Sequence, residues 1–305
     1  MAYTAADVKN LRETTGAGMM DCKKALDETQ DMQKAIDYLR AKGLAAAAKK
    51  QSRIAAEGLI SACVKGKIGA LVEVNCETDF VAKNDDFQKF ATTAANIAVD
   101  ANLTSIDQLL SAKSPNSHTI KDNISELTIK IGEKIDLRRV EVLKLEGNGM
   151  IGSYVHSGKI GVLCRVETDK DVTGNEAFRD LVKDLCMHVA AASPQFLSGS
   201  DIDETFKARE AEVYAAQLKE QGKPEAMIPN IVKGKLAKLA SDVCLYEQAF
   251  VKDPDTTVGK LIESVGKTAG AAIKVTKFIK LNLGEGLQKK EDDFAAEVAR
   301  MTGQN

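Results

Sequence analysis

The sequence predicts an α+β fold, because three kinds of pattern follow one another along its 305 residues. Residues 4–42 show short helical patterns separated by turns. Two later stretches share the order hairpin, helix and closing strand, and the second is interrupted by two helical patterns joined by a short turn. We therefore expect an N-terminal three-helix bundle, a core of two repeated antiparallel-sheet-plus-helix subdomains, and a projecting antiparallel helical hairpin.

The N-terminal bundle is expected to hold three short helices. The glycine turn at residues 16–18 ends the first helix, and the second is expected at about 19–28. The third is expected at about 32–41 and ends at Gly43, because glycine commonly follows a helix C-terminus. Some forty residues make only a marginal core, so the bundle should be attached to a larger body. The alanine- and lysine-rich residues 44–56 predict a helical linker.

A repeated unit accounts for most of the remaining chain. Residues 61–69 align without gaps on 153–161, and both read as a strand, a glycine-containing turn and the start of a second strand. The second strands lead into Glu-Thr-Asp, at 77–79 and, with a two-residue gap, at 167–169. Each unit continues with an Asn-x-x-Phe helix start and a late strand, at Asn84 and 137–145 in the first and at Asn175 and 273–281 in the second.

These patterns divide the chain into segments of different character. They are a helical bundle (1–43), a helical linker (44–56), a core N-subdomain (57–147), a core C-subdomain (148–200 and 246–286), a helical coiled-coil hairpin (201–245) and a C-terminal helix (287–305).

Composition argues against several classes of partner and site. A net charge of −2 offers no electrostatic case for direct nucleic-acid binding or for an anionic membrane. The six cysteines lie at least 13 residues apart, so neither a disulfide framework nor zinc-ligand spacing is visible. The N-terminus resembles no signal or transit peptide, and no apolar run reaches membrane-spanning length. We expect a cytoplasmic protein.

No catalytic motif is visible. Residues 265–268 mimic the end of a phosphate-binding loop, but Leu261 stands where that loop requires glycine. We therefore expect no enzyme, no cofactor and no bound metal. An enzyme whose site converges around His156 and His188 remains an alternative, as does a peptide- or ubiquitin-like-binding scaffold that uses Met19 and Met20.

Phe80 distinguishes the two units. After Thr-Asp the first unit has Phe80 and Val81, whereas the second has Lys170 and Asp171. A ring that completed the core of this unit type should have an apolar counterpart, although duplicated cores also diverge. Phe80 is therefore either an exposed probe or a core residue of one copy. Of the adjacent Met19 and Met20, we expect one buried and one exposed.

Two longer stretches resemble a known family. Residues 15–26, Thr-Gly-Ala-Gly-Met-Met-Asp-Cys-Lys-Lys-Ala-Leu, are similar to the N-terminal signature of the translation elongation factor Ts family. Residues 73–84, Glu-Val-Asn-Cys-Glu-Thr-Asp-Phe-Val-Ala-Lys-Asn, resemble its second signature, and residues 187–191 and 293–299 fit as well. The resemblance covers essentially the whole chain and implies a ubiquitin-associated-like bundle, a two-subdomain core and a coiled-coil hairpin.

The resemblance also implies a function. The family consists of guanine-nucleotide exchange factors that bind GDP-bound elongation factor Tu, displace Mg²⁺ and promote GDP release, so that GTP can bind during translation elongation. Elongation factor Tu would be the partner, in an assembly that can pair two such complexes, with neither nucleic acid nor membrane bound directly. Segment 100–126 and the hairpin match only loosely. The implied residues are Thr78, Asp79, Phe80 and Val81 for Mg²⁺ displacement, Arg12, Met19 and Met20 for docking by the bundle, and Ile131, Gly132 and His156 for further contacts.

Overall fold

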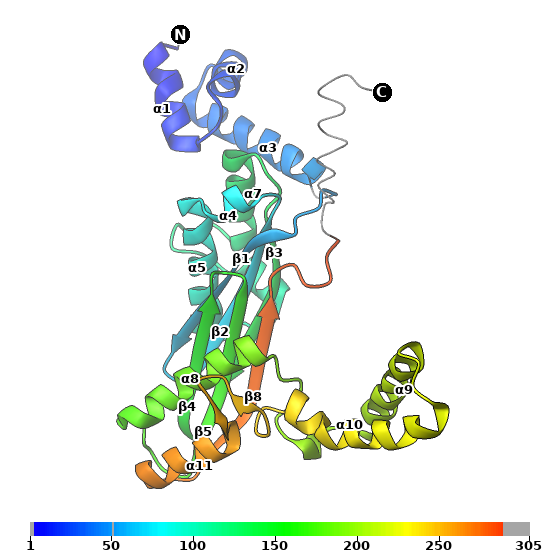
Figure 1. The fold of residues 1–305 in the computed structure, drawn as a ribbon. Helices are drawn as coiled ribbons and strands as arrows, with labels where there is room; N and C mark the ends of the chain where they lie inside the picture. The colour runs from blue at the N-terminus through cyan, green and yellow to red at the C-terminus, as the bar shows by residue number, and fades with distance from the viewer. Residues whose placement is uncertain (1–2, 51, 289–305) are drawn as a thin grey trace.

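The computed structural model describes residues 3–50 and 52–288 (Figure 1). It contains the helical bundle, two three-stranded antiparallel sheets with helices, and a projecting helical hairpin, so the predicted α+β class is confirmed. The C-terminal helix expected within 287–305 falls almost wholly in residues 289–305, outside the described part.

The bundle consists of α1 (Ala5–Thr15), α2 (Met19–Thr29) and α3 (Met32–Lys50), around a small core that includes Leu11 and Cys22. The helix end expected at Gly43 is wrong, because α3 continues through it to Lys50. A Cβ atom on residue 43 would lie 1.9 Å from the side chain of Ile129, which belongs to a helix of the first repeated unit. Gly43 therefore marks the place where α3 packs closely on another helix, at a modest cost in helix propensity.

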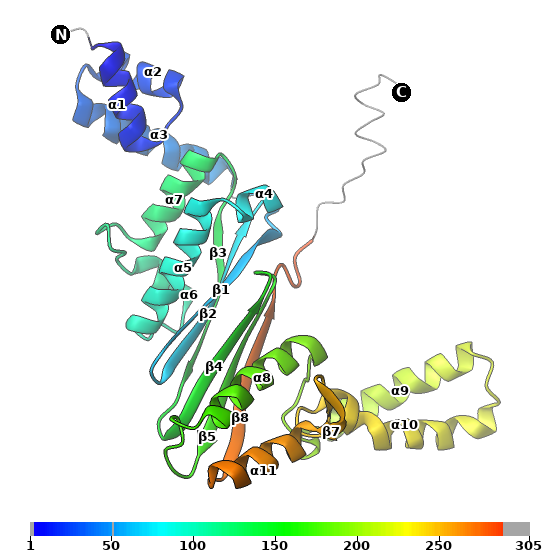
Figure 2. The same ribbon diagram turned by 60° about the vertical axis from the view of Figure 1, so that its left-hand side comes forward.

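Each repeated unit forms one sheet with helices on its outer face. In the first sheet β2 (Ile68–Cys76) lies between β1 (Glu57–Lys65) and β3 (Asp136–Lys144), and its helices are α5 (Asp85–Asp100), α6 (Ile106–Ser111) and α7 (Ile120–Ile131). In the second sheet β5 (Ile160–Thr168) lies between β4 (Asn148–His156) and β8 (Ile273–Asn282), and its helices are α8 (Glu176–Ala192) and α11 (Val258–Ala269). A short pair, β6 (Ala249–Phe250) and β7 (Asp253–Thr257), lies beside α11 (Figure 2).

Strand pairing corrects the gapless alignment of the two hairpins. Gly58 and Gly149 are equivalent, because both have a φ near 130–137° and approach the carbonyl oxygen of the paired strand. The first turn holds two residues between paired Lys65 and Ile68, whereas the second holds three, 157–159. The first strands are thus related by a shift of 91 residues and the second strands by 92.

The same register corrects the Glu-Thr-Asp alignment. Strands β2 and β5 end at Cys76 and Thr168, so the counterpart of Glu77 is Asp169. Beyond that point, Asn84 and Asn175 donate their N–H groups to the carbonyl oxygens of Val81 and Val172 respectively. Val172 is therefore the counterpart of Val81, and the second unit still has no ring where Phe80 stands.

The two sheets pack face to face, so both faces of their central strands are buried. In β2, Ala70, Val72 and Val74 face the helices, while Leu71 faces the other sheet. The layer between the sheets consists of Ile60, Leu71, Leu143, Leu145, Ile151, Leu163 and Leu281. Such continuous burial explains why these strands read as apolar runs rather than as alternating patterns.

Two glycines make this close packing reciprocal. A Cβ atom on Gly161 would lie 2.4 Å from Ile60 and 3.1 Å from Leu71. A Cβ atom on Gly69, its counterpart, would lie 2.7 Å from Ile151 and 3.2 Å from Leu163 in the other unit. Each sheet therefore places a glycine against the isoleucine and leucine of its partner.

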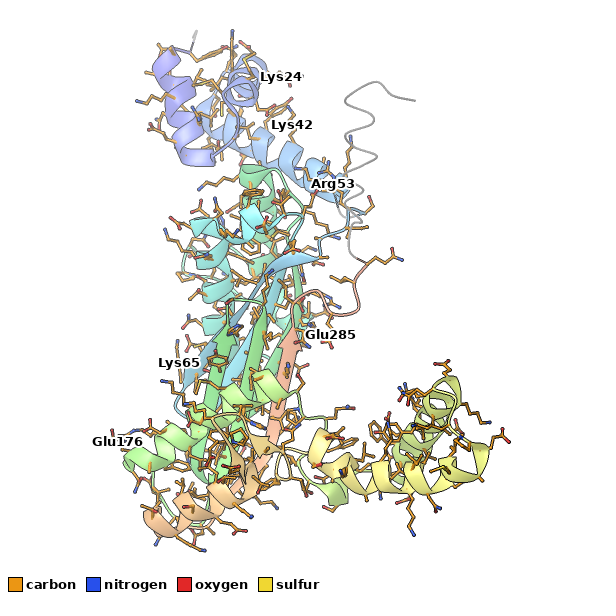
Figure 3. The ribbon with its side chains drawn as sticks, viewed as in Figure 1. Lys24, Lys42, Arg53, Lys65, Glu176 and Glu285 are labelled. Carbon is orange, nitrogen blue, oxygen red and sulfur yellow. The ribbon has the colours of Figure 1, made fainter. Side chains whose placement is uncertain are left out.

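A buried ion pair joins the end of the second unit to the first sheet. Glu73 is fully buried and bonds Arg138, Arg139 and the Gly284 N–H group, the last at 2.9 Å. Burial acts to raise the pKa of the Glu73 carboxyl, but the hydrogen bond from Gly284 and the guanidinium groups together hold it below its usual value. Arg138 also donates to the carbonyl oxygen of Glu285, which Figure 3 labels beside the first sheet.

The hairpin consists of α9 (Glu204–Glu220) and α10 (Ile228–Val243), which project from the second unit (Figures 1 and 2). Ile228, Leu239 and Val243 form part of an apolar stripe along α10 and are buried. Phe196 packs edge-on against Phe206 at the base of the hairpin. Apolar packing within and beneath the hairpin therefore accounts for that stripe. Within residues 3–50 and 52–288, no helix is both long and apolar enough to cross a membrane.

The inter-sheet glycines give a direct test of this packing. Gly161→Ala should lower the free energy of unfolding by about 1–3 kcal/mol, because its new methyl group meets Ile60. Gly174→Ala is the matched control, since no atom lies within 4 Å of its added carbon, and should change stability by less than about 0.5 kcal/mol. Urea unfolding measures both, and equal midpoints for the two variants would contradict the packing described.

Candidate functional site

The stretch Thr78–Val81 begins a single helical turn rather than a simple strand end. Helix α4 (Asp79–Ala82) follows β2, and the Thr78 side chain caps it by accepting the Val81 N–H at 3.4 Å. The Phe80 side chain is 80% exposed, whereas Val81 is 9% exposed and belongs to the core of the first unit. Of the two readings of Phe80, the exposed one is correct, and the adjacent valine supplies the buried contact.

Lys83 flanks the exposed ring. Its Nζ atom lies 2.8 Å from Asp79 Oδ2 and 5.8 Å from the centroid of Phe80. The hydrogen bond from Lys83 lowers the pKa of Asp79, and the more distant charge of Lys159 lowers it further. The helix therefore presents an apolar ring beside a charged carboxylate that is already paired.

Lys159 belongs to the β4–β5 turn, so the second unit reaches the neighbourhood of α4 (Figure 2). This turn is fixed to the first sheet by the Ile60 N–H, which donates to the Gly158 carbonyl oxygen at 2.7 Å. His156 is exposed at the end of β4, with its Nδ1 atom 3.1 Å from the Tyr154 hydroxyl. The structure thus brings Phe80 and the turn next to His156 to one region, although they come from different units.

Ile131 and Gly132 lie at the end of α7. Gly132 is exposed in a left-handed conformation and ends the helix, and its carbonyl oxygen accepts from Lys50 Nζ at 2.6 Å. The next residue, Glu133, accepts hydrogen bonds from the backbone N–H groups of Glu77 and Thr78. The end of α7 is therefore bonded both to the end of α3 and to the start of α4.

Arg12, Met19 and Met20 are all exposed on the bundle, the two methionines by 47% and 74%. The expectation that one methionine is buried is wrong. Cys22, together with Ala25 and Leu26, already fills the inward face of α2. Helices α2 and α4 lie toward the same end of the molecule in both views (Figures 1 and 2).

Three residues around α4, namely Lys83, Glu133 and Lys159, were not predicted from the sequence. Lys83 had a visible signal, because it lies four residues after Asp79 and can pair with it on a helix. Glu133 lies 55 residues from Thr78, and no local pattern predicts that contact. Lys159 belongs to the other unit, so only the packing of the two sheets brings it near.

The two histidines proposed for an enzymatic site occupy different environments. His188 is fully buried, its Nδ1 accepts from the Val251 N–H, and its Nε2 lies 2.9 Å from Gln248 Oε1. Burial lowers the pKa of His188, so its neutral form is favoured. His156, by contrast, is exposed. Across the described residues, no group of three or more His, Cys, Asp or Glu side chains could hold a metal ion.

Comparison with known proteins identifies the family. Residues 77–285, which include α4, strand β3 of the first sheet, the whole second sheet and the hairpin, match the family model described as elongation factor TS. The chain belongs to the elongation factor Ts family. It is 48% identical to the elongation factor Ts of Trichlorobacter lovleyi over 99% of both chains. It is also 45% identical to that of Clostridium perfringens over 98% of this chain and 99% of the relative, and 46% identical to that of Rickettsia bellii over 97% and 96%. Family membership makes it a translation elongation factor.

Stability measurements can separate the exposed and buried residues of α4. Val81→Ala should cost about 1–3 kcal/mol of unfolding free energy, because it removes two buried methyl groups. Phe80→Ala should change that free energy by less than about 0.5 kcal/mol, since the ring makes little contact with the core. Urea unfolding of both variants checks the contrast, and a larger loss for Phe80→Ala would mean that the ring is part of the core.

Proposed function

We propose that this elongation factor Ts family member is a guanine-nucleotide exchange factor for elongation factor Tu. It binds the GDP-bound GTPase, displaces the GTPase's Mg²⁺ and promotes GDP release so that GTP can bind. The observation that carries the proposal is the 80% exposure of Phe80 on an anchored helix. Covering a large apolar side chain in that position with a partner protein removes its surface from water and so favours binding.

Exchange requires a difference in affinity between two states of the GTPase. A factor that binds the nucleotide-free GTPase more tightly than the GDP-bound form weakens GDP binding by the same ratio. Mg²⁺ bridges the phosphates and the phosphate-binding loop of such enzymes, so its displacement weakens nucleotide binding directly. The factor acts by binding alone and needs neither a catalytic group nor a cofactor of its own.

Phe80 has enough surface to supply this difference. Burying about 150–200 Å² of ring surface at about 25 cal/mol per Å² yields on the order of 4–5 kcal/mol before ordering costs. Those costs are reduced because α4 is already formed and capped. We infer that Phe80 inserts near the phosphate site, while Asp79 and Val81 hold its direction.

The N-terminal bundle supplies docking rather than displacement in this account. Met19 and Met20 are flexible, polarizable side chains that suit an adaptable protein contact, and Arg12 is exposed nearby on α1. Ile131, Gly132 and His156 are the further contacts proposed around α4. The partner is a protein, without direct nucleic-acid or membrane contact, in the cytoplasm, and two factor–GTPase pairs can associate.

Release of a fluorescent GDP analogue from elongation factor Tu tests the proposal. The wild-type chain should accelerate release, and Phe80→Ala should lower the maximal rate about 10- to 100-fold, or about 1.4–2.7 kcal/mol. Met20→Ala should instead raise the concentration for half-maximal rate. Val251→Ala, which truncates an exposed apolar side chain of the other unit, should change neither.

Two results would contradict different parts of the proposal. No acceleration by the wild-type chain would rule out exchange activity and favour the scaffold alternative. Acceleration that Phe80→Ala leaves unchanged would retain exchange activity but exclude Phe80 as the displacing group.

A further inference from the structure

A single carboxylate holds the start of α4. Glu133 Oε2 accepts hydrogen bonds from the Glu77 N–H at 3.1 Å and the Thr78 N–H at 3.0 Å. Its Oε1 atom accepts from the Thr78 hydroxyl at 2.7 Å. Because that hydroxyl also caps α4 through the Val81 N–H, Glu133 fixes both the backbone before the helix and the capping side chain.

The contact is reciprocal, because Glu77 reaches back to the segment that carries Glu133. Glu77 Oε1 accepts from the Lys134 N–H at 2.7 Å, and Arg53 Nη1 lies 3.2 and 3.3 Å from the two Glu77 oxygens. Figure 3 labels Arg53 close to the end of α3. We call this pair of crossed carboxylates, Glu77 and Glu133, the α4 clasp.

The second unit repeats one half of the clasp and lacks the other. Asp169, the counterpart of Glu77, accepts from the Ala272 N–H at 2.9 Å, as Glu77 does from Lys134. The pairs Val74–Leu137 and Val166–Val275 set this equivalence and place Ala271 at the position of Glu133. The repeated half therefore belongs to the scaffold, while the Glu133 half occurs only in the unit that carries Phe80.

We propose that Glu133 is a positioning residue for nucleotide exchange, which sets the direction of Phe80 by anchoring the N-terminal end of α4. This inference rests on the proposed function and deepens it. Hydrogen bonds to a carboxylate are stronger than hydrogen bonds between neutral groups. The three that Glu133 accepts hold a helix of a single turn, which is too short to be stable alone.

If Glu133 positions Phe80, its removal should change one kinetic quantity of GDP release and not the other. Without the Glu133 carboxylate, the start of α4 frays and Phe80 occupies its productive direction for a smaller share of the time. The docking residues on the bundle are unaffected. The maximal rate of GDP release should therefore fall, while the factor concentration at half-maximal rate changes little.

A double-mutant cycle tests this in the full chain with elongation factor Tu. Glu133→Ala should lower the maximal release rate about tenfold, and Glu133→Gln, which keeps one acceptor oxygen, should restore part of it. In a Phe80→Ala background, Glu133→Ala should have no further effect. Glu141→Ala removes an exposed carboxylate from β3 as the control and should leave the rate unchanged. Equal losses with and without Phe80 would show that Glu133 supports the fold rather than Phe80.

Hydrogen exchange in the free protein tests the clasp without the GTPase. Glu133→Ala should speed amide exchange at Glu77, Thr78 and Val81 about tenfold, and Glu141→Ala should not. Unchanged exchange at these amides would overturn the proposal whatever the release assay shows. If Phe80→Ala leaves GDP release unaltered, the displacing role of Phe80 fails in its own right, and amide exchange alone then decides whether Glu133 anchors α4.

Discussion

The close approach of the two sheets is the constraint on which the rest of the structure depends. It is possible because Gly69 and Gly161 each leave room for an isoleucine and a leucine of the other unit. This packing holds the β4–β5 turn against Ile60 and so places Lys159 near Asp79. The candidate site combines residues of both units only because the sheets meet in this register.

The region around Phe80 combines exposure with local rigidity. Val81 anchors the helix to the core, Thr78 caps it, and Glu133 holds the cap, so the ring is presented without being buried. Such preorganisation lowers the entropy lost when a partner covers the ring. Met19 and Met20 are exposed on a separate bundle, and in the function we propose they supply affinity while Phe80 supplies displacement.

Much of this architecture could be predicted from the sequence, because its patterns are local. Helical periodicity, turn glycines and the repeated hairpin predicted the bundle, the two units and the helical hairpin. The errors arose where tertiary packing decides. Gly43 does not end a helix but leaves room for Ile129. The gapless alignment of the two hairpins did not reveal the extra residue in the turn 157–159.

The candidate site was predictable only in the part that a comparison of the two repeated units reveals. The absence of a ring in the second unit indicated that Phe80 is unusual, and the structure shows it exposed. The environment of that ring was not predictable, because Glu133 and Lys159 come from segments far away in the chain. Both methionines are exposed because Cys22, Ala25 and Leu26 already occupy the inner face of α2.

Photocrosslinking from position 80 tests most directly whether Phe80 is the group that reaches the phosphate site. A photoreactive benzoylphenylalanine in place of Phe80 would be irradiated in the complex with nucleotide-free elongation factor Tu, and the crosslinked peptide identified by mass spectrometry. We expect a crosslink to the GTPase's nucleotide-binding domain, next to the residues that hold Mg²⁺. A crosslink to another domain, or none while the same variant still accelerates GDP release, would contradict it.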